Sequence, residues 1–463
     1  MAEATSPTPT TKLTGEQLKR SLTERQLTMI AIGGAIGVGL FLGSSVTIQL
    51  AGPGVIISYL IGALIAGVVA FSLAEMAVLQ PFSGSFGVYA ETYLSRWAGF
   101  CVRVTYGLVQ IIAIGAEVTA VGIYFSFWFP QVSAWIWIAS VSLGLVAVNA
   151  LQVANFGEFE YWFAAIKVSA IAAFIVIGLA LIVGAGPARA IGIQNLFHHG
   201  GFFPHGFKGV WLALTLVVTS YIGVEVVAVT AGEAKDPEKS VPKAMRAILI
   251  RLLLFYGLAI AIMLCLTSWN TLASGGITGS PFVRAFASVG IPFSAGIMNA
   301  VVITAALSSA NTNLYLSTRM LYSLSRAEYA PGWLGRLGSN AVPQYALAVS
   351  ASGMALAILL AVFAPANAFL LLYGTAVAGM FFVWIVILLT HLRFRKLIST
   401  ETVARLPLKL MFHPWTSIAG LASLIAISIT TFWVDGLRYS VPVFTILLAL
   451  ETIFYFRVRR SHA

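Results

Sequence analysis

The chain alternates long apolar stretches with short polar connections. Twelve stretches approach or exceed the roughly 20 apolar residues that a helix needs to cross a bilayer. They cover residues 27–46, 53–77, 98–128, 133–151, 160–184, 208–231, 247–269, 289–319, 344–363, 367–391, 414–434 and 439–457. The third and the eighth are long enough to extend past the bilayer or to tilt strongly. The pattern predicts an all-α polytopic membrane protein with about twelve transmembrane helices.

The composition agrees with a protein that faces lipid. Of the 463 residues, 59% are hydrophobic and 9% are charged, and the mean hydropathy is +0.92. A soluble domain carries roughly 25% charged residues and could not cover its surface with so few. The net charge of +11 does not indicate a nucleic-acid-binding protein, because the basic residues lie at the ends of apolar stretches and form no single patch. We expect contact with a lipid bilayer and no nucleic acid partner.

The distribution of Lys and Arg predicts the orientation in the membrane. If the N-terminus is inside, the inner connections and span ends hold 22 of the 27 basic residues. Four basic residues then lie outside, namely Arg189, Lys208, Arg284 and Arg438, and Lys167 lies within the fifth stretch. Basic residues concentrate on the cytoplasmic side of membrane proteins. We therefore expect a multi-pass protein of the cell (inner) membrane with both termini in the cytoplasm.

The polar connections are expected to be loops. Residues 1–26 lack the apolar core of a signal peptide and, being rich in Ser, Thr and Pro, are expected to form a disordered cytoplasmic tail. Ser21 and Glu24 have the spacing of a capping box, which predicts a helix start just before the first apolar stretch unless the match is fortuitous. The predicted inner loops include residues 78–94, 232–246 and 391–409.

Two short runs suggest an internal repeat. Ile36-Gly37-Val38 lies near the middle of the first stretch and Ile222-Gly223-Val224 near the middle of the sixth, 186 residues later. Helices interrupted by glycine at matching places in two halves mark the central site of many transporters. Because five spans are an odd number, the second half must be inverted. We predict two five-helix repeats, 27–184 and 208–391, followed by two additional helices within 414–457.

The first stretch is unusually rich in glycine, with five between residues 33 and 43. Glycines spaced four apart allow close packing of membrane helices, which is one interpretation. The other is a helix broken at the bilayer midplane, whose second half points free N–H groups and a positive dipole end at an anion such as a carboxylate. The residues leave both interpretations open.

Three ionisable residues lie deep in apolar stretches: Glu117, Lys167 and Glu225. A charge at that depth is costly, so such residues usually face a cavity and have a function there. Lys167 could instead extend its amine to the inner head groups. Otherwise it is a buried amine that can exchange a proton as the protein changes state. The two carboxyls could also be protonated structural groups. Further polar candidates near the midplane are Tyr106, Gln110, Tyr221 and Asn311.

Several kinds of chemistry are not indicated. Cys101 and Cys265 lie within or beside apolar stretches and indicate neither a disulfide framework nor a metal cluster. All six histidines lie in predicted loops or at span ends, so no pair is placed to hold a metal or haem inside the bilayer. The chain has no phosphate-binding glycine loop and no nucleophile–base pair. We expect no enzyme activity, no cofactor and no metal.

Four runs resemble the bacterial amino acid permeases of the amino acid transporter family, within the amino acid–polyamine–organocation superfamily. The runs are TERQLTMIAIGGAIGVGLFLGSS, GEFEYWFAAIKV, SYIGVEVVAVTAGEAKDPEKSVPKA and MNAVVITAALSSANTNLYLSTRMLYSLSR. The similarity extends from about Leu18 to about Lys396. It implies the five-plus-five inverted-repeat fold of the bacterial leucine transporter, with the first and sixth spans unwound at a central site.

The resemblance also implies roles for individual residues. Backbone donors at Ile36, Gly37, Val38 and Gly39 would bind a substrate carboxylate, and carbonyls around Tyr221 and Gly223 would face its amine. Lys167 matches a lysine that replaces the sodium ion of related carriers, which implies H⁺ as the coupling ion. Glu117 and Glu225 match acidic positions of the family. One departure is the Tyr221-Ile222 pair, where many members have a small or polar residue beside the glycine.

We therefore expect a secondary active amino acid importer, coupled to protons by symport and working by alternating access. The expected substrate-binding residues are Ile36, Gly37, Val38, Gly39, Tyr106, Gln110, Tyr221, Gly223 and Glu225, and Lys167 and Glu117 are expected to serve proton coupling. Open alternatives are an amino acid exchanger and a carrier of another small organic amine or a nucleobase on the same fold. A channel or a membrane enzyme is disfavoured, and residues 78–94 lack the acidic-basic signature of major-facilitator carriers. The residues do not indicate which amino acid is carried.

Overall fold

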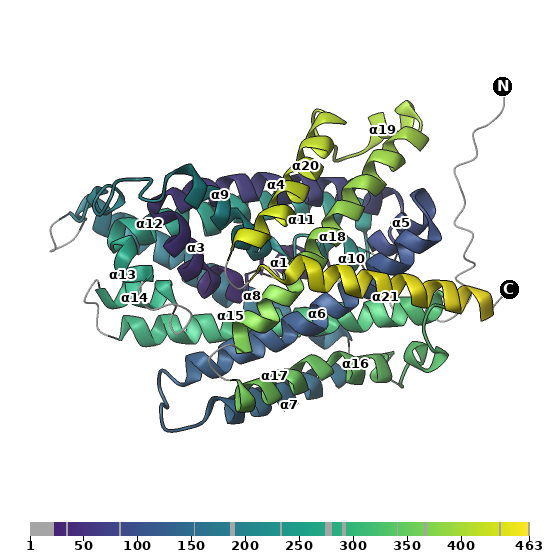
Figure 1. The fold of residues 1–463 in the computed structure, drawn as a ribbon, viewed down its shortest axis with the longest axis horizontal. Helices are drawn as coiled ribbons and strands as arrows, with labels where there is room; N and C mark the ends of the chain where they lie inside the picture. The colour runs from purple at the N-terminus through teal and green to yellow at the C-terminus, as the bar shows by residue number, and fades with distance from the viewer. Residues whose placement is uncertain are drawn as a thin grey trace.

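The computed structural model is a bundle of helices. It describes residues 23–461 except 34–35, 83–84, 152, 186–189, 232–233, 274–279, 289–292, 340, 365–367 and 435–436, and no β-strand occurs among these residues. Most of its long helices run roughly along the longest axis of the molecule, and a few cross that axis obliquely (Figure 1). In the described part, nine helices are long and apolar enough to cross a membrane, and two shorter apolar helices, Ala134–Ala150 and Leu254–Leu266, accompany them. The predicted all-α polytopic membrane fold is confirmed.

Each of the twelve predicted stretches coincides with helical residues. The unbroken ones are α4 (Val55–Leu79), α6 (Arg96–Phe125), α7 (Ala134–Leu151), α8 (Val153–Val183), α15 (Ser294–Arg326), α18 (Ala368–Leu397), α20 (Trp415–Thr430) and α21 (Ser440–Ser461). The ninth stretch is α16 (Gln344–Ser350) followed by α17 (Ser352–Phe363), and the seventh is the end of α11 (Pro237–Arg251), a π-helical segment (Leu252–Leu258) and α12 (Ala259–Leu266). The third and eighth stretches, α6 and α15, are long as predicted, with 30 and 33 residues.

The first and sixth stretches are interrupted helices. In the first, α1 (Glu24–Gly33) is followed by non-helical residues at Ile36 and Gly37 before α2 (Val38–Phe41) and α3 (Gly43–Ala51) begin. In the sixth, α9 (Gly206–Val217) tightens into the 3-10 segment η3 (Val218–Tyr221), and α10 (Val226–Ala231) starts after a gap of four residues. Gly223 lies in this gap with φ +104°, a conformation that glycine adopts without a Cβ penalty. Neither stretch is a continuous helix.

Helix contacts recur when the two halves are exchanged. In the first half α6 is the third span and packs against α18, the tenth, while in the second half α15 is the eighth span and packs against α8, the fifth. Likewise α7 packs against α15, and α17 packs against α6. A two-fold relation between spans one to five and six to ten generates these pairs. The contacts agree with the inverted-repeat fold, whereas the residue bounds given for the repeats stay a prediction.

The three predicted inner loops contain helices, so their description as loops was wrong. The connection 78–94 contains α5 (Ser85–Tyr93), 232–246 is helical from Pro237 onward in α11, and 391–409 contains the end of α18 and α19 (Thr400–Arg405). Hydropathy missed α11 and α19 because they carry exposed charged residues such as Lys239, Lys243 and Glu401, and it missed α5 because this helix has only nine residues. Pro237 suits the first helical position, where no N–H partner is lost. Two further short helices, α13 (Trp269–Ala273) and α14 (Pro281–Ser288), lie in the predicted outer connections.

The cap of the first helix lies two residues after the predicted one. Ser21 is outside the described residues. Thr23 and Gln26 instead form the reciprocal pair, with the Thr23 amide donating to Gln26 Oε1 at 3.0 Å and the Gln26 amide donating to Thr23 Oγ1 at 3.4 Å. This is capping-box geometry with a glutamine at the third helical position. Both sites satisfy the spacing rule, so spacing alone could not choose between them.

A buried ionic cluster joins α4 to α18. Glu75 on α4 is fully buried and accepts hydrogen bonds from Arg395 at 2.7 and 2.9 Å and from the Leu410 amide, and it lies 3.0 Å from Nε2 of His391. His391 is therefore not in a loop but buried inside α18. His413 lies outside the predicted spans. Burial, together with the neighbouring His391 and Arg395, lowers the pKa of His413 to about 4, so His413 is neutral at pH 7.

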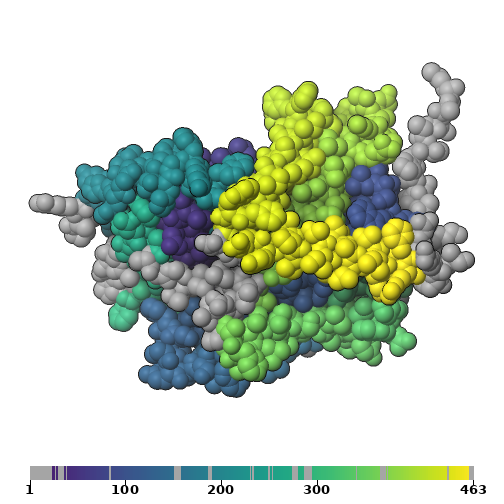
Figure 2. Space-filling model, viewed as in Figure 1, coloured from purple at the N-terminus to yellow at the C-terminus, as the bar shows by residue number. Residues whose placement is uncertain are grey.

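The last two long helices have an apolar outer surface that suits contact with lipid. Figure 2 shows α20 and α21 lying across one face of the molecule. Their outward side chains are large and apolar, including Trp415, Ile425, Ile429, Ile446 and Leu450. Contiguous apolar surface of this kind is unfavourable in water. It is what a bilayer-spanning protein presents to acyl chains.

Candidate functional site

A cavity lies where the two interrupted helices meet α6, α15 and α18. A water-sized sphere can occupy about 60 Å³ of this cavity. Its polar wall consists of Glu117, Thr219, Ser220, Ser309 and Asn313, together with the backbone at Gly37 and Gly39. Its apolar wall consists of Val109, Ala113, Ala116, Ile222, Ala376 and Val377. A mainly apolar cavity with a few convergent polar groups is typical of a small-molecule site.

The first interruption packs tightly against α6 and α15 at Gly37. Glu117 on α6 accepts a hydrogen bond of 2.7 Å from the hydroxyl of Ser309 on α15. A Cβ atom on Gly37 would lie 2.5 Å from Glu117 Oε1 and 2.6 Å from Ser309 Oγ. Only glycine therefore fits at this position without a shift of its neighbours. This contact brings the non-helical segment against a carboxyl group at the cavity wall.

Lys167 lies on the other side of the same segment and does not reach the membrane surface. Its side chain is fully buried, and Nζ lies 2.8 Å from Ser308 Oγ, 3.3 Å from the Ile36 carbonyl oxygen and 3.8 Å from Glu160 Oε1. Ser308 in turn donates to Glu160 at 2.5 Å. The interpretation of Lys167 as an amine that extends to the head groups is wrong.

Glu160 is a partner that the sequence interpretation missed. It precedes Lys167 by seven residues on α8, and seven residues are close to two helical turns, so both side chains lie on one face. Both are fully buried. A buried charge is stable only when it is paired and hydrogen-bonded. The seven-residue spacing between Glu160 and Lys167 could have indicated this pair from the sequence.

Glu225, Tyr106 and Gly223 form a separate buried cluster. Glu225 Oε1 lies 3.2 Å from the Tyr106 hydroxyl, and both carboxyl oxygens lie 3.1 Å from the Gly223 amide nitrogen. Glu225 therefore closes over the end of the second interruption, where free N–H groups are expected. None of these three residues is on the wall of the cavity.

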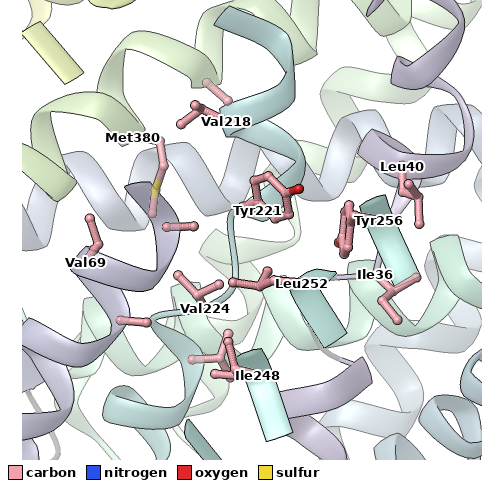
Figure 3. Close-up of a cluster of buried hydrophobic side chains, with 14 of the residues drawn as sticks. Ile36, Leu40, Val69, Val218, Tyr221, Val224, Ile248, Leu252, Tyr256 and Met380 are labelled. Carbon is pink, nitrogen blue, oxygen red and sulfur yellow. The ribbon is translucent and has the colours of Figure 1, made fainter. Parts of the chain in front are cut away.

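Tyr221 and the Ile36 side chain belong to the apolar core. The Tyr221 hydroxyl donates to the carbonyl oxygen of Tyr59 at 2.7 Å, and its ring lies 4.7 Å from that of Tyr256. Figure 3 shows both Tyr221 and Tyr256 among buried apolar side chains that include Ile36. We expect these side chains to stabilise the position of the interrupted helices.

Of the eleven predicted site residues, the structure brings three to the cavity wall: Gly37, Gly39 and Glu117. Gln110 is buried on α6, away from this wall. Val38 begins α2. Asn311, a further polar candidate, faces α7, where its Oδ1 accepts from Asn149 at 2.6 Å.

Sequence reasoning missed most of the polar wall. Thr219 and Ser220 directly precede the second interruption, and Ser309 and Asn313 lie four residues apart on α15. Residues four apart share a helix face. A polar pair of this spacing in an apolar stretch was therefore a usable signal. The alanines and valines of the apolar wall gave no such signal, because residues of these types are also common at lipid-facing and core positions.

No metal centre is present in the described part of the chain. No three His, Cys, Asp or Glu side chains gather there in a way that could hold an ion. Cys101 and Cys265 are buried free thiols. The cavity has the geometry of a small-molecule binding site between helices.

The chain is similar to known permeases over nearly its whole length. A family model for amino acid permeases matches residues 26–460. An uncharacterized amino acid permease of Bacillus subtilis (strain 168), YtnA, is 41% identical over 441 residues, which is 94% of this chain and 95% of YtnA. The probable threonine/serine transporter YbxG of the same bacterium is 39% identical over 448 residues, 96% of each chain. The aromatic amino acid transport protein AroP of Escherichia coli (strain K12) is 38% identical over 447 residues, 95% of this chain and 96% of AroP. By its fold, its central cavity and these matches, the chain belongs to the amino acid permease family.

Proposed function

We propose that this protein is a secondary active amino acid importer of the cell membrane, driven by proton symport and working by alternating access. Membership of the amino acid permease family supports amino acid transport as the activity. The relatives YbxG and AroP are described as carrying threonine and serine or aromatic amino acids. The excess of basic residues on one side supports cytoplasmic positions for both termini.

The observation that carries proton coupling is the fully buried amine of Lys167. Its neighbours are a carbonyl oxygen (Ile36), a hydroxyl (Ser308) and a carboxyl (Glu160), contributed by the first span, α15 and α8. Oxygen groups of these kinds suit a hard cation. The Lys167 ammonium takes the place of such a cation among these oxygen groups. The ion that can bind to this site and leave it is therefore a proton, carried by the Lys167 amine.

The substrate is proposed to bind in the cavity beside the first interruption. Backbone N–H groups of residues 36–39 would face its carboxylate, as free N–H groups at a helix start favour an anion. Its amine would face the second interruption, where Thr219, Ser220 and Ile222 are the wall residues. The Tyr221 and Gly223 carbonyls already accept backbone N–H groups of Val224 and Val226.

Glu117 is proposed to link the substrate to the proton. It is the ionisable group on the cavity wall, and it touches Gly37. Lys167 contacts the neighbouring residue, Ile36. A substrate that moves the first interruption therefore changes the surroundings of both groups. Binding energy then shifts the population between outward-open and inward-open states.

The test uses purified protein in proteoliposomes with an imposed pH gradient. Lys167→Ala should abolish accumulation of amino acid against its gradient while leaving counterflow exchange measurable. The control is Lys239→Ala, because the Lys239 side chain is 81% exposed on the surface of α11 and should not affect transport. Accumulation by Lys167→Ala that still follows the pH gradient would refute the coupling. Wild-type counterflow without any accumulation would instead indicate an exchanger.

A further inference from the structure

The cavity has two chemically different parts. Its polar groups are the backbone of the first interruption, Thr219 and Ser220 just before the second, Ser309 and Asn313 on α15, and Glu117 on α6. Its apolar side chains come from α6 and α18, which pack against each other, and from the second interruption. They are Val109, Ala113 and Ala116 on α6, Ala376 and Val377 on α18, and Ile222. A zwitterionic head group suits the polar part, and an uncharged side chain suits the apolar part.

The apolar part is bounded by a close helix contact. A Cβ atom on Gly379 of α18 would lie 2.6 Å from Val109 Cγ2, so glycine is what allows α18 to approach α6 here. Gly379 lies one helical turn after Ala376. Because the backbones are held close, the small side chains of Ala113 and Ala376 leave the space in which a substrate side chain can lie.

The ionisable groups indicate which side chains are accepted. Glu117 is the one ionisable residue among those on the wall, and no basic residue is found there within the described part of the chain. An acidic substrate side chain would be buried without a counter-charge, which is strongly unfavourable. A basic side chain would need a carboxyl in addition to Glu117. The other carboxyl that the sequence analysis proposed for the site is Glu225. It is not on the cavity wall, and its oxygens contact the Tyr106 hydroxyl and the Gly223 amide.

We infer that the substrate is an amino acid with an uncharged side chain, and that this side chain lies between α6 and α18, where Ala113 and Ala376 limit its size. This inference rests on the proposed function. It goes further by naming the substrate class and the two positions that select within it.

The first experiment measures binding to the purified full-length protein by thermal shift and calorimetry. The ligands are alanine, threonine, leucine and phenylalanine, then lysine and arginine, then aspartate and glutamate. A bound ligand raises the apparent melting temperature by mass action. We expect binding within the uncharged group alone. Binding of a basic or acidic amino acid with equal or higher affinity would overturn the inference and leave the proposed function intact. Binding of none would overturn the proposed function as well.

The second experiment changes the size of the apolar part. Ala113→Leu and Ala376→Leu should weaken binding of the largest uncharged ligand by at least about tenfold relative to alanine, because a pocket discriminates one added methylene by about 10- to 200-fold. Ala355→Leu is the control, since Ala355 is exposed on the apolar surface of α17. An equal effect on small and large ligands would contradict a side-chain pocket at this place.

A variant that enlarges the same space tests the pocket even if the two leucine variants misfold. Val377→Ala removes two methyl groups from the α18 wall and should shift preference toward larger uncharged side chains. A preference unchanged by this variant, in protein that melts like the wild type, would remove α18 from the pocket.

Discussion

Gly37→Ala is the sharpest perturbation of the central site. Gly37 is not among the glycines with positive φ, so alanine is opposed there by space and not by backbone conformation. The added methyl would lie 2.5 Å from Glu117 Oε1, whereas ordinary contacts begin at 3.4 Å, so one partner must retreat by about 0.9 Å. Ser309 Oγ, at 2.6 Å, blocks the other direction. Overpacking of this kind costs about 1–3 kcal/mol.

The expected result is weaker substrate binding with the fold preserved. If this cost falls on the substrate-bound form, the affinity for the substrate falls on the order of 10- to 100-fold, because about 1.4 kcal/mol corresponds to a factor of ten. The assay is calorimetric titration of detergent-purified protein with its best amino acid ligand, accompanied by a melting curve. We expect the unliganded melting temperature to fall as well, with a loss of no more than about 1–3 kcal/mol of stability, because the same close contact opposes the methyl group without ligand.

Gly144→Ala is the matched control. Gly144 lies inside α7, and nothing is found within 4 Å of the Cβ that alanine would add. Alanine inside a helix is about 0.5–1 kcal/mol more favourable than glycine. The control should therefore bind normally and melt at the same or a slightly higher temperature. Wild-type affinity in Gly37→Ala would refute the close contact between the first interruption and Glu117.

Two further substitutions test the frame around the site. Gly353→Ala would place a Cβ 1.8 Å from the backbone oxygen of Ile111, so α6 and α17 must separate. We expect a loss of stability at or above the upper end of about 1–3 kcal/mol, measured as a lower melting temperature or a loss of monodisperse protein. An unchanged melting curve would contradict this contact. Glu75→Gln removes the buried carboxylate that pairs with Arg395, whose side chain is 12% exposed, so the loss should stay at or below about 3–5 kcal/mol, the cost of breaking a fully buried pair. The melting temperature should fall and should recover in part when Arg395→Gln is added, whereas a double variant less stable than the single one would argue against a direct ion pair.

The sequence was sufficient to predict the membrane fold, because bilayer thickness leaves a signal of about 20 apolar residues for each span. The repeated Ile-Gly-Val run indicated where the interruptions could lie, but it left close helix packing open, and the unwinding itself was implied by the resemblance to the permeases. The helices α5, α11 and α19 were missed for the opposite reason. They lie outside the long apolar stretches, and their charged residues resemble those of a loop when only hydropathy is considered.

The site was predicted less completely than the fold. Local signals identified the glycines at the interruption and the deep carboxyl Glu117. The partners of Lys167 could not be chosen in the same way, because Ser308 is 141 residues away and Ile36 is 131 residues away in the chain. Such contacts follow from how α8, α15 and the first span pack together. Tyr106 and Glu225 were predicted to bind substrate. Both are buried and contact each other, and their depth in the sequence gave no information on whether they face the cavity.

Two consecutive residues connect the two halves of the proposed mechanism. The Ile36 carbonyl accepts a hydrogen bond from Lys167, and Gly37 fits against Glu117 and Ser309 at the cavity wall. Both residues lie outside α1 and α2. A shift that opens the cavity must change the distance from Ile36 to Lys167, because one peptide joins the two contacts. Coupling between substrate and proton then requires no long chain of intermediates, and it should weaken in any variant that stiffens residues 36 and 37 without altering either cluster.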